Sequence, residues 1–422
     1  MQQLYGNALV GQSGGPTAAI NATLAGVCRG ALGEIARGAD GAIRRLFGMR
    51  NGVDGFLRED IVELDRLLAP NDQADETALD RLALTPAAAL GSCRRKLPAP
   101  GSTDEEATMG RLFDLFRAYD IRYFFYIGGN DSMDTVAKVS AYAARVGYDM
   151  RVMGVPKTID NDLVGTDHTP GFGSAAKYIA VTMREILRDT AVYTIPAVTI
   201  VEIMGRDAGW LTAASALGRL VGGPEPDLVY LPEVPFSYDA FFEDLAEALA
   251  RHPNVTVAVS EGLRDENGRF VGEGTQSGAT DAFGHRYLAG TAKALELMVK
   301  EKLGCKVRSV ELNLPQRCAG HLVSAQDIEE SLAVGAAAVR AAVSGVTCRM
   351  MTITRLSTDP YAFRVDHEDI FKIANMTRNV PREYMNARGN NVTDDCLAYL
   401  LPLIRGERYP QYVDGLPVHW SL

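Results

Sequence analysis

Residues 152–162 read V-M-G-V-P-K-T-I-D-N-D, a short apolar run that passes directly into a polar turn. Short apolar runs bounded by turn residues are typical of buried strands. Five similar runs lie elsewhere in the chain, at residues 8–10, 123–127, 198–203, 255–259 and 307–312. Ala- and Leu-rich segments of helical character separate them, at residues 18–29, 133–146, 174–188 and 240–251. This alternation predicts an α/β protein with mostly parallel sheets.

Glycine or ionisable residues follow five of the six apolar runs. These junctions are Gly11–Pro16, Gly128–Ser132, Pro156–Asp162, Met204–Asp207 and Ser260–Gly262. Because the carboxyl ends of parallel strands form the ligand crevice of an open sheet, the five junctions are expected to meet at one edge. One such junction has little meaning alone, but five in succession predict a ligand site.

Length and composition narrow the class of protein. A chain of 422 residues is too long for one ordinary domain, and 47% apolar with 23% charged residues is typical of globular proteins. We find no apolar stretch long enough for a membrane span and no signal-peptide pattern at the N-terminus, which predicts a cytoplasmic protein. The six cysteines form no CxxC pair, which favours reduced thiols over a metal site. A net charge of −10 argues against nucleic-acid or acidic-membrane partners.

Two glycine pairs, Gly14-Gly15 and Gly128-Gly129, lie where an expected strand turns into an expected helix. Glycine lets backbone N–H groups approach an anion, and a helix N-terminus adds favourable partial charge. Either pair is also compatible with a plain tight turn. Neither fits the P-loop or the dinucleotide fingerprint, so phosphate binding by another kind of loop is the better interpretation.

The run from Lys157 to Asp162 places two carboxylates, Asp160 and Asp162, beside an ammonium group. Transfer of a phosphoryl group to an alcohol needs a base for the hydroxyl proton and cations for the moving oxygens. An Asx-turn that merely closes a loop is the alternative for an isolated I-D-N-D. The position after a strand and next to Lys157 favours the chemical interpretation.

Two further cationic segments of the chain are candidates for phosphate binding. Arg206 follows a buried run, where it suits a phosphate, although it could equally pair with Asp207 on the surface. The segment Arg94-Arg95-Lys96 is a local cationic cluster in an acidic chain. Such a cluster is more often a solvated face than a binding site.

Taken together, these segments resemble the phosphofructokinase family from about residue 7 to about residue 320, with the motifs in unbroken order. The matching segments are Ser13-Gly14-Gly15 through Asn21, Gly91-Ser92-Cys93-Arg94, Gly128–Ser132, Pro156–Asp162, Met204-Gly205-Arg206, Glu261-Gly262, and Arg308 with Gln316-Arg317. The resemblance implies two Rossmann-like three-layer domains with the active site in the cleft between them. The expected division is 1–171 plus about 316–365 for the donor domain and 172–315 plus about 366–422 for the sugar-phosphate domain.

The resemblance also implies a role for each matching residue. Asp160 would take the proton from the sugar C1 hydroxyl, Thr158 would position the moving phosphoryl group, and Arg206 would steady it. The residues expected at the donor phosphates are Gly14 and Arg94, and those expected around the sugar are Met204, Gly205 and Glu261. Arg308 and Arg317 resemble the pair that grips the sugar 6-phosphate. The expected Mg²⁺ site is Asp162 with Asn130 or Asp131, since Asn130 replaces the usual aspartate.

Two positions bear on the phosphoryl donor. ATP-using members of the family have glycine where this chain has Asp131 and Lys157. A carboxylate there would repel an α-phosphate, while an ammonium group can pair with a short, highly charged donor. The resemblance therefore implies transfer from pyrophosphate to fructose 6-phosphate, with Asp131 and Lys157 in the catalytic set. The alternatives are an ATP-dependent phosphofructokinase and a non-catalytic sugar-phosphate sensor.

Other departures from the family pattern concern the sugar and the C-terminus. Ala197 and Leu314 stand where bacterial ATP-dependent members have an Arg and a His that contact the sugar phosphate. Fewer groups would then hold the 6-phosphate, so sedoheptulose 7-phosphate is expected as a second substrate. After Arg317 we predict a helix over Asp327–Ser344 and a family-specific cap or interface element beyond it. A homodimer or homotetramer is expected by resemblance.

Overall fold

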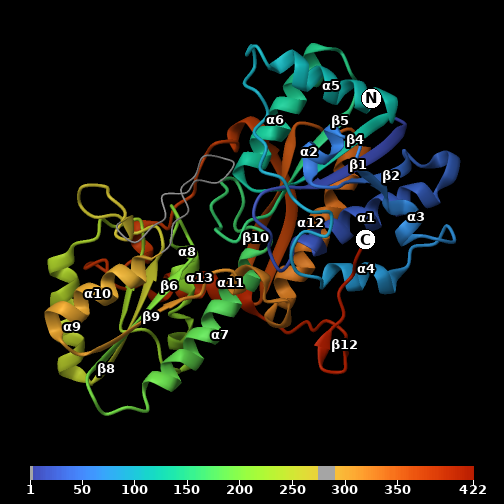
Figure 1. Cartoon of the computed structure of the whole chain (residues 1–422). Coiled ribbons are helices and arrows are strands. Elements are labelled where there is room, and N and C mark those ends of the chain that lie inside the picture. Colours follow the sequence, from blue (N-terminus) through green and yellow to red (C-terminus); the bar gives the residue numbers. More distant parts are fainter. Residues whose placement is uncertain (1–2, 274–289) are drawn as a thin grey trace.

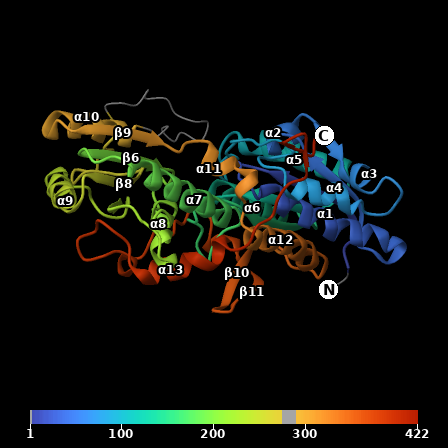
Figure 2. The ribbon, with the colours of Figure 1, turned by 90° about the horizontal axis from the view of Figure 1, so that it is seen from below.

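The structure is a computed structural model that describes residues 3–273 and 290–422. Among these residues, the two large β-sheets lie in separate lobes, seen side by side in Figure 1 and from below in Figure 2. All six apolar runs are strands: β1 (Gly6–Gln12), β4 (Ile121–Gly128), β5 (Arg151–Pro156), β6 (Ala197–Ile203), β8 (Asn254–Ser260) and β9 (Lys306–Glu311). The prediction of an α/β protein is confirmed.

The first sheet has seven strands in the order β11-β10-β5-β4-β1-β2-β3. The strands that the sequence analysis did not identify are β2 (Ile43–Met49), β3 (Ile61–Glu63), β10 (Arg349–Thr358) and β11 (Tyr361–Asp369). Both edge strands, β3 and β11, run antiparallel to their neighbours, whereas the other pairs are parallel. The parallel core of the sheet therefore directs the carboxyl ends of β1, β4 and β5 to one edge.

Helices cover both faces of this sheet. One face carries α1 (Ile20–Ala36), α4 (Glu76–Ala83) and α12 (Ala325–Val343), and the other carries α2 (Gly52–Leu57), α5 (Glu105–Ala118) and α6 (Asn130–Arg145). Successive side chains of β4 alternate between the two cores, with Phe125 on the α1 side and Phe124 on the α5 side. Because both faces are buried, the strands need apolar residues at nearly every position.

The second sheet has four parallel strands in the order β7-β8-β6-β9, with β7 at Leu228–Tyr230. One face packs against α9 (Tyr238–Arg251) and α10 (Thr291–Leu303). The other packs against α7 (Phe172–Thr190), α8 (Trp210–Ala214) and α13 (Asp394–Leu400). The short helix α3 (Leu64–Leu68) adds Leu64 and Leu68 to the first core on the α1 side. Two further short elements are α11 (Pro315–Cys318) and the β12–β13 pair (Tyr412–Val413 and Leu416–Pro417).

The C-terminal hundred residues complete both lobes instead of forming a separate cap. Strands β10 and β11 extend the first sheet, while α13 joins the core of the second lobe. The division expected at about residue 365 falls inside β11, and Ile370 and Ile373 still pack in the first core. The last residues return to the first lobe, where the Trp420 amide donates to Thr85 Oγ1 at 2.8 Å. None of the helices in the described ranges has the length and apolar character needed to cross a bilayer.

Candidate active site

A cleft of about 760 Å³ collects residues from all five junctions. Its walls come from the first lobe through the segments after β1, β4 and β5, and from the second lobe through the segments after β6 and β8. Every junction follows a parallel strand at its carboxyl end. The prediction that these junctions meet is therefore met by the structure.

Lys157 stabilises the loop after β1 through hydrogen bonds to its backbone. This side chain is only 2% exposed, and its ammonium group donates to the carbonyl oxygens of Ser13 at 3.0 Å and Gly15 at 2.5 Å. Gly14 between them has φ of +77°, a left-handed conformation that favours glycine. Its amide donates to the carbonyl of Cys93 at 3.1 Å, which ties the loop to the segment that carries Arg94.

Three cations gather at this side of the cleft. Burial lowers the pKa of Lys157 to about 8; the charge of Asp160 opposes this shift, and the positive charges of Arg94 and Arg317 reinforce it. Burial likewise lowers the pKa of Arg317, with Arg94 as the next cause. A Cβ built on Gly15 would lie 3.6 Å from a guanidinium nitrogen of Arg317. Positive charges gathered in this way form a site suited to a multivalent anion.

The turn after β5, residues Thr158–Asp162, places two carboxylates in the cleft. Thr158 Oγ1 accepts from the Asp160 amide at 3.1 Å, and Asn161 adopts a left-handed conformation with φ of 56°. Burial raises the pKa of Asp160, although Arg206 and Lys157 oppose the shift. Burial and the charge on Asp160 raise the pKa of Asp162 to about 7. A carboxylate with a raised pKa is a stronger base, as proton abstraction from an alcohol requires.

The opposite wall is formed by the segments after β6 and β8. The Met204 amide donates to Gln316 Oε1 at 3.1 Å, and the Gly205 amide donates to Glu261 Oε1 at 3.4 Å. Gly205 has φ of +140°. Burial, followed by the charge of Asp160, raises the pKa of Glu261 to about 8. A neutral carboxyl group at this position can both donate to and accept from sugar hydroxyl groups.

The helix α6 begins at the junction after β4, with Asn130 and Asp131 in its first turn. The side chain of Asn130 is already used on both sides: Nδ2 donates to the Met376 carbonyl at 2.7 Å, and Oδ1 accepts from the Asn375 amide at 2.7 Å. Because both ends of the side-chain amide are hydrogen-bonded to the C-terminal segment, Asn130 is a poor candidate for a metal ligand. The Asp131 carboxylate lies 3.5 Å from the ammonium of Lys96 and is 30% exposed.

The cleft brings together almost all of the residues singled out from the sequence. Its lining includes Gly14, Arg94, Asn130, Asp131, Lys157, Thr158, Asp160, Asp162, Met204, Arg206, Glu261 and Arg317, while Gly205 adjoins it through its bond to Glu261. Arg308 is the exception. It pairs with Thr199 on β6, four residues before the carboxyl end of that strand, which at about 3.3 Å per residue is about 13 Å from the edge. It lines a separate pocket with Lys306 and Tyr193, so Arg308 and Arg317 do not form one site within this chain.

Comparison with known proteins agrees with this geometry. The family model described as phosphofructokinase matches residues 7–342. The chain belongs to the phosphofructokinase family. Two relatives are each called a pyrophosphate–fructose 6-phosphate 1-phosphotransferase. That of Halomonas elongata is 41% identical over 413 residues, covering 97% of this chain and 94% of that protein. That of Xanthomonas campestris pv. campestris is 42% identical over 420 residues, covering 99% and 96%.

A solved structure of the same family extends the agreement to the whole fold. The crystal structure of the pyrophosphate-dependent phosphofructokinase of Nitrosospira multiformis matches with a TM-score of 0.85 at 38% identity. The match covers 98% of this chain and 95% of that one. The expected phosphofructokinase fold of two Rossmann-like lobes is therefore confirmed.

Several residues of the phosphofructokinase cleft were not identified from the sequence. These are Glu202, Glu311, Asn313, Asn375 and Thr377. Glu202 could have been identified, because a carboxylate in the apolar run of β6 is unusual. Its oxygens accept hydrogen bonds from the amides of Gly290 and Ala292 at the start of α10. No sequence feature pointed to Asn375 and Thr377, since they reach the cleft from a segment beyond the recognisable motifs.

Proposed function

We propose that this chain transfers a phosphoryl group reversibly from pyrophosphate to the C1 hydroxyl of fructose 6-phosphate. The observation that carries the choice of donor is the position of Lys157, buried under the Gly14 loop, where it forms a cluster of positive charge with Arg94. Two linked phosphates carry their whole charge within the reach of such a cluster. The names of the two relatives in the preceding section support the same donor and acceptor.

Asp160 is the proposed base. Its carboxylate would take the proton of the C1 hydroxyl as the oxygen attacks the near phosphorus of pyrophosphate. The new bond joins that oxygen to phosphorus, and the bond to the bridging oxygen breaks to release orthophosphate. Thr158 would position the moving phosphoryl group, and Arg206 with Lys157 would offset charge on its oxygens. In the reverse direction Asp160 returns the proton.

Mg²⁺ is the proposed cofactor, held by Asp162 and Asp131. Mg²⁺ commonly uses one or two carboxylates together with substrate phosphates, so a cage of three protein ligands is not required. The described residues contain no cluster of three His, Cys, Asp or Glu side chains that could hold a metal. The raised pKa of Asp162 fits a cation, because a nearby positive charge would offset the cost of burying this carboxylate. When bound, the ion would neutralise charge on the phosphate oxygens.

The sugar is expected against Met204, Gly205 and Glu261, with its 6-phosphate near Arg317. Leu314 lines the same cleft and is 52% exposed, so it supplies an apolar surface without a hydrogen bond to the sugar phosphate. A less constrained phosphate end would admit a longer sugar. We therefore propose sedoheptulose 7-phosphate as a second substrate.

We also propose a cytoplasmic homodimer or homotetramer. Arg308 matches a phosphate-gripping residue of the family but lies outside its own cleft. In an assembly of two or more copies, Arg308 would bind the sugar phosphate in the cleft of a neighbouring subunit. Light scattering after size exclusion, with Arg308→Ala assayed for its fructose 6-phosphate KM, tests this arrangement; a monomer whose KM is unchanged by the substitution would refute it.

The donor is tested by a coupled assay of the purified protein with fructose 6-phosphate and Mg²⁺. Three parallel reactions contain pyrophosphate, ATP or no donor. Turnover with pyrophosphate, and none above the background rate with ATP, is the expected result. Turnover with ATP alone would refute the donor assignment, and binding of fructose 6-phosphate without turnover by any donor would indicate a sensor.

A further inference from the structure

The turn that carries Asp160 and Asp162 has no helix or strand of its own, yet both residues are only partly exposed to solvent. Besides bonds within residues 158–171, contacts from α13 and from the segment between β11 and α13 hold it, and β10 reinforces them through Asp167. These elements lie in the C-terminal hundred residues, to which the family motifs assign no part in the reaction.

Asn161 is the residue of the turn that faces away from the cleft. It is completely buried and lies between the two carboxylates in the chain. Its Oδ1 accepts from the Thr169 amide at 3.1 Å, and its Nδ2 donates to the hydroxyl of Tyr399 at 3.1 Å. Since its φ of 56° is a left-handed conformation, these two bonds help to keep the turn in a shape that most residues avoid.

The Tyr399 hydroxyl uses its full hydrogen-bonding capacity at this point. It accepts from Asn161 and from the Arg378 guanidinium at 2.9 Å, and it donates its single proton to the Asp167 carbonyl at 2.7 Å. Burial raises the pKa of Tyr399, so the hydroxyl stays protonated. One atom thus joins the catalytic turn, the C-terminal segment and the chain that leads into α7.

Arg378 grips the same turn through its backbone and its side chain. Its amide donates to the Asp162 carbonyl at 2.7 Å. Its guanidinium donates to the carbonyl oxygens of Thr166, at 2.9 Å, and Asp167, and it lies 4.5 Å from the ring centroid of Trp210. The planar fork is therefore fixed on both edges and on one face.

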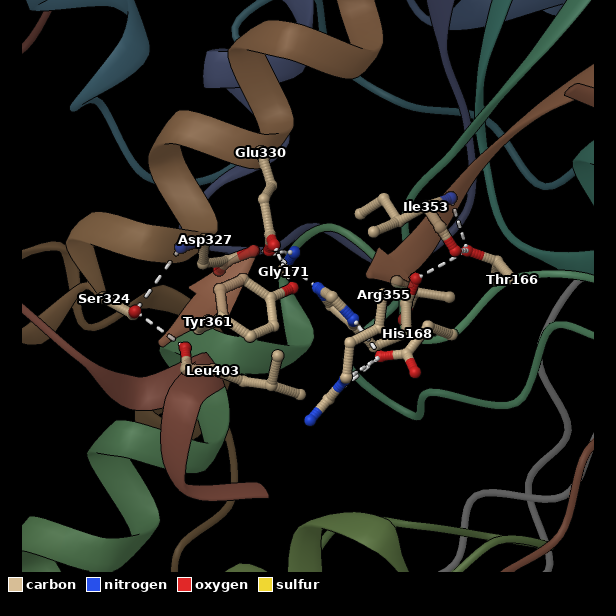
Figure 3. A network of polar contacts seen from close by, with 12 residues as sticks. Thr166, His168, Gly171, Ser324, Asp327, Glu330, Ile353, Arg355, Tyr361 and Leu403 are labelled. Carbon is tan, nitrogen blue, oxygen red and sulfur yellow. Dashed lines mark hydrogen bonds and ion pairs between the residues drawn. The ribbon is translucent and has the colours of Figure 1, made fainter. Parts of the chain in front are cut away.

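A second layer of charges fixes Asp167 in turn; its members His168, Glu330 and Arg355 are labelled in Figure 3. The Asp167 carboxylate accepts from Arg355 at 2.9 Å and from His168 at 2.8 Å. The other nitrogen of His168 contacts Glu330 at 2.6 Å, and Glu330 also accepts from Tyr361 at 2.5 Å. Burial alone would lower the pKa of His168, but Glu330 and Asp167 raise it to about 9. A charged imidazole between two carboxylates makes this layer a rigid support.

We propose that Tyr399 and Arg378 are positioning residues that hold Asp160 and Asp162 in the reactive geometry by way of Asn161. This inference rests on the proposed function for its kinetic consequences, but not for its structural ones. A displacement of about 1 Å at a reacting group can cost a hundredfold in rate. Loss of the Tyr399 hydroxyl should therefore reduce turnover without removing any substrate contact.

The first test compares Tyr399→Phe with Tyr384→Phe. Tyr384 packs in the same aromatic cluster, 6.0 Å from Tyr399 between ring centroids, and within the described ranges its hydroxyl makes no hydrogen bond to the turn. We expect Tyr399→Phe to lower kcat about tenfold to a hundredfold, with KM for pyrophosphate and for fructose 6-phosphate changed less than about twofold. Tyr384→Phe should leave kcat within about twofold of wild type.

A double-mutant cycle with Asn161→Gly separates positioning from general stability. Glycine tolerates the left-handed conformation but removes both side-chain bonds. If Tyr399 acts through Asn161, the two substitutions together should cost little more in kcat than either alone. Multiplicative losses in kcat, or a kcat of Tyr399→Phe equal to wild type, would overturn the proposal. Should Tyr399→Phe fail to fold, Arg378→Lys, which keeps the charge over Trp210, is subject to the same criteria.

Hydrogen exchange provides a test that does not depend on activity. The amides of Thr158 and Thr169 are bonded within the 158–171 segment, so their exchange reports on the turn. This segment should exchange faster in Tyr399→Phe than in wild type, and at the wild-type rate in Tyr384→Phe. If wild type fails to turn over while the exchange difference is present, the proposed function fails and the positioning contact stands. Unchanged exchange in Tyr399→Phe would overturn the inference whatever the activity.

Discussion

The ammonium of Lys157 lies 3.0 Å from the carbonyl oxygen of Ser13, underneath the glycine loop that faces the cleft. A second bond, to Gly15 at 2.5 Å, makes the same group a brace between the two arms of the loop. An ammonium group has three donors, and these two bonds use two of them. Lys157 therefore shapes the glycine loop and adds charge to it, two roles that a neutral residue of the same length would lose.

Replacing Lys157 by Met is the first prediction. The side chain keeps its approximate length but loses all three donors, so kcat/KM for pyrophosphate should fall by about a hundredfold, equivalent to about 2.7 kcal/mol. Steady-state kinetics with varied pyrophosphate measures the effect. Lys177→Met is a matched control, because Lys177 is also buried and donates to two carbonyl oxygens, of Val323 and Gly406, away from the cleft. Equal losses of kcat/KM in both variants would contradict a specific role for Lys157.

Replacing both Asp131 and Lys157 by Gly should relax donor selection. Removal of the carboxylate paired with Lys96 and of the buried ammonium opens volume and takes away repulsion from an α-phosphate. Turnover with pyrophosphate should fall, and turnover with ATP should rise above the no-donor background. The same coupled assay serves as the measurement, with each single variant as a control. A double variant that loses pyrophosphate activity and binds no ATP in calorimetry would show that other residues exclude the nucleotide.

Asp160→Ala should abolish turnover while the fold stays intact. General-base catalysis contributes about 100- to 10,000-fold in rate, and this substitution removes the proposed base. Because burial raises the pKa of Asp160, loss of the carboxylate should not lower the melting temperature. Initial rates together with thermal unfolding by circular dichroism check both parts. Asp239→Ala, at an exposed position on α9, is the control. Activity of Asp160→Ala within tenfold of wild type would assign the proton to another group.

The strands and the cleft were predictable because the physics that forms them is local. A parallel strand buried on both faces needs a continuous apolar run. The residues that follow it line the ligand crevice at the edge of the sheet, where polar side chains are needed. Residues 152–162 show both features within eleven positions, and β5 with its turn lies where the run predicted. Asp160 and Asp162 were thus placed correctly before any contact was known.

The contacts that support the turn could not be predicted in this way. Asn161 and Tyr399 are 238 positions apart, and nothing in either local sequence indicates the other. Strand β10 was missed because its second half, from Arg355 onward, leaves the buried core and alternates less clearly. The predicted position of Arg308 was wrong for a different reason. Its distance from the crevice depends on the register of β9 against β6, which the local sequence does not specify.

The stability of the ligand-free protein should depend on the charge of Asp162. Its pKa rises from the usual 3.8 to about 7 on folding, because of burial and the charge of Asp160. A raised carboxyl pKa favours the folded state below pH 3.8, and this contribution is lost as the pH rises through 7. Asp162→Asn stays neutral at every pH. Its melting temperature should therefore exceed that of wild type by several degrees at pH 8 and by less at pH 5.

Thermal unfolding at the two pH values, with and without Mg²⁺, measures this difference. Glu301→Gln, at an exposed position on α10, is the control and should show no such pH-dependent gain. Bound Mg²⁺ should narrow the gap between wild type and Asp162→Asn at pH 8, since the ion stabilises the carboxylate. A gain that is larger at pH 5 than at pH 8 would reverse the sign and refute the buried-charge explanation.

Gly262→Ala should damage the site through Arg206 although position 262 carries no reacting group. A Cβ at Gly262 would collide with the carbonyl oxygen of Arg206, so the backbone there must move. Overpacking of this kind costs about 1–3 kcal/mol, and the displacement of Arg206 should lower kcat at least about tenfold. Gly33→Ala, in α1 with open space around its Cβ position, is the matched control and should be neutral or stabilising by up to about 1 kcal/mol. Wild-type kcat in Gly262→Ala would mean that Arg206 acts without a fixed backbone, and that the tight contact between the segments after β6 and β8 serves packing alone.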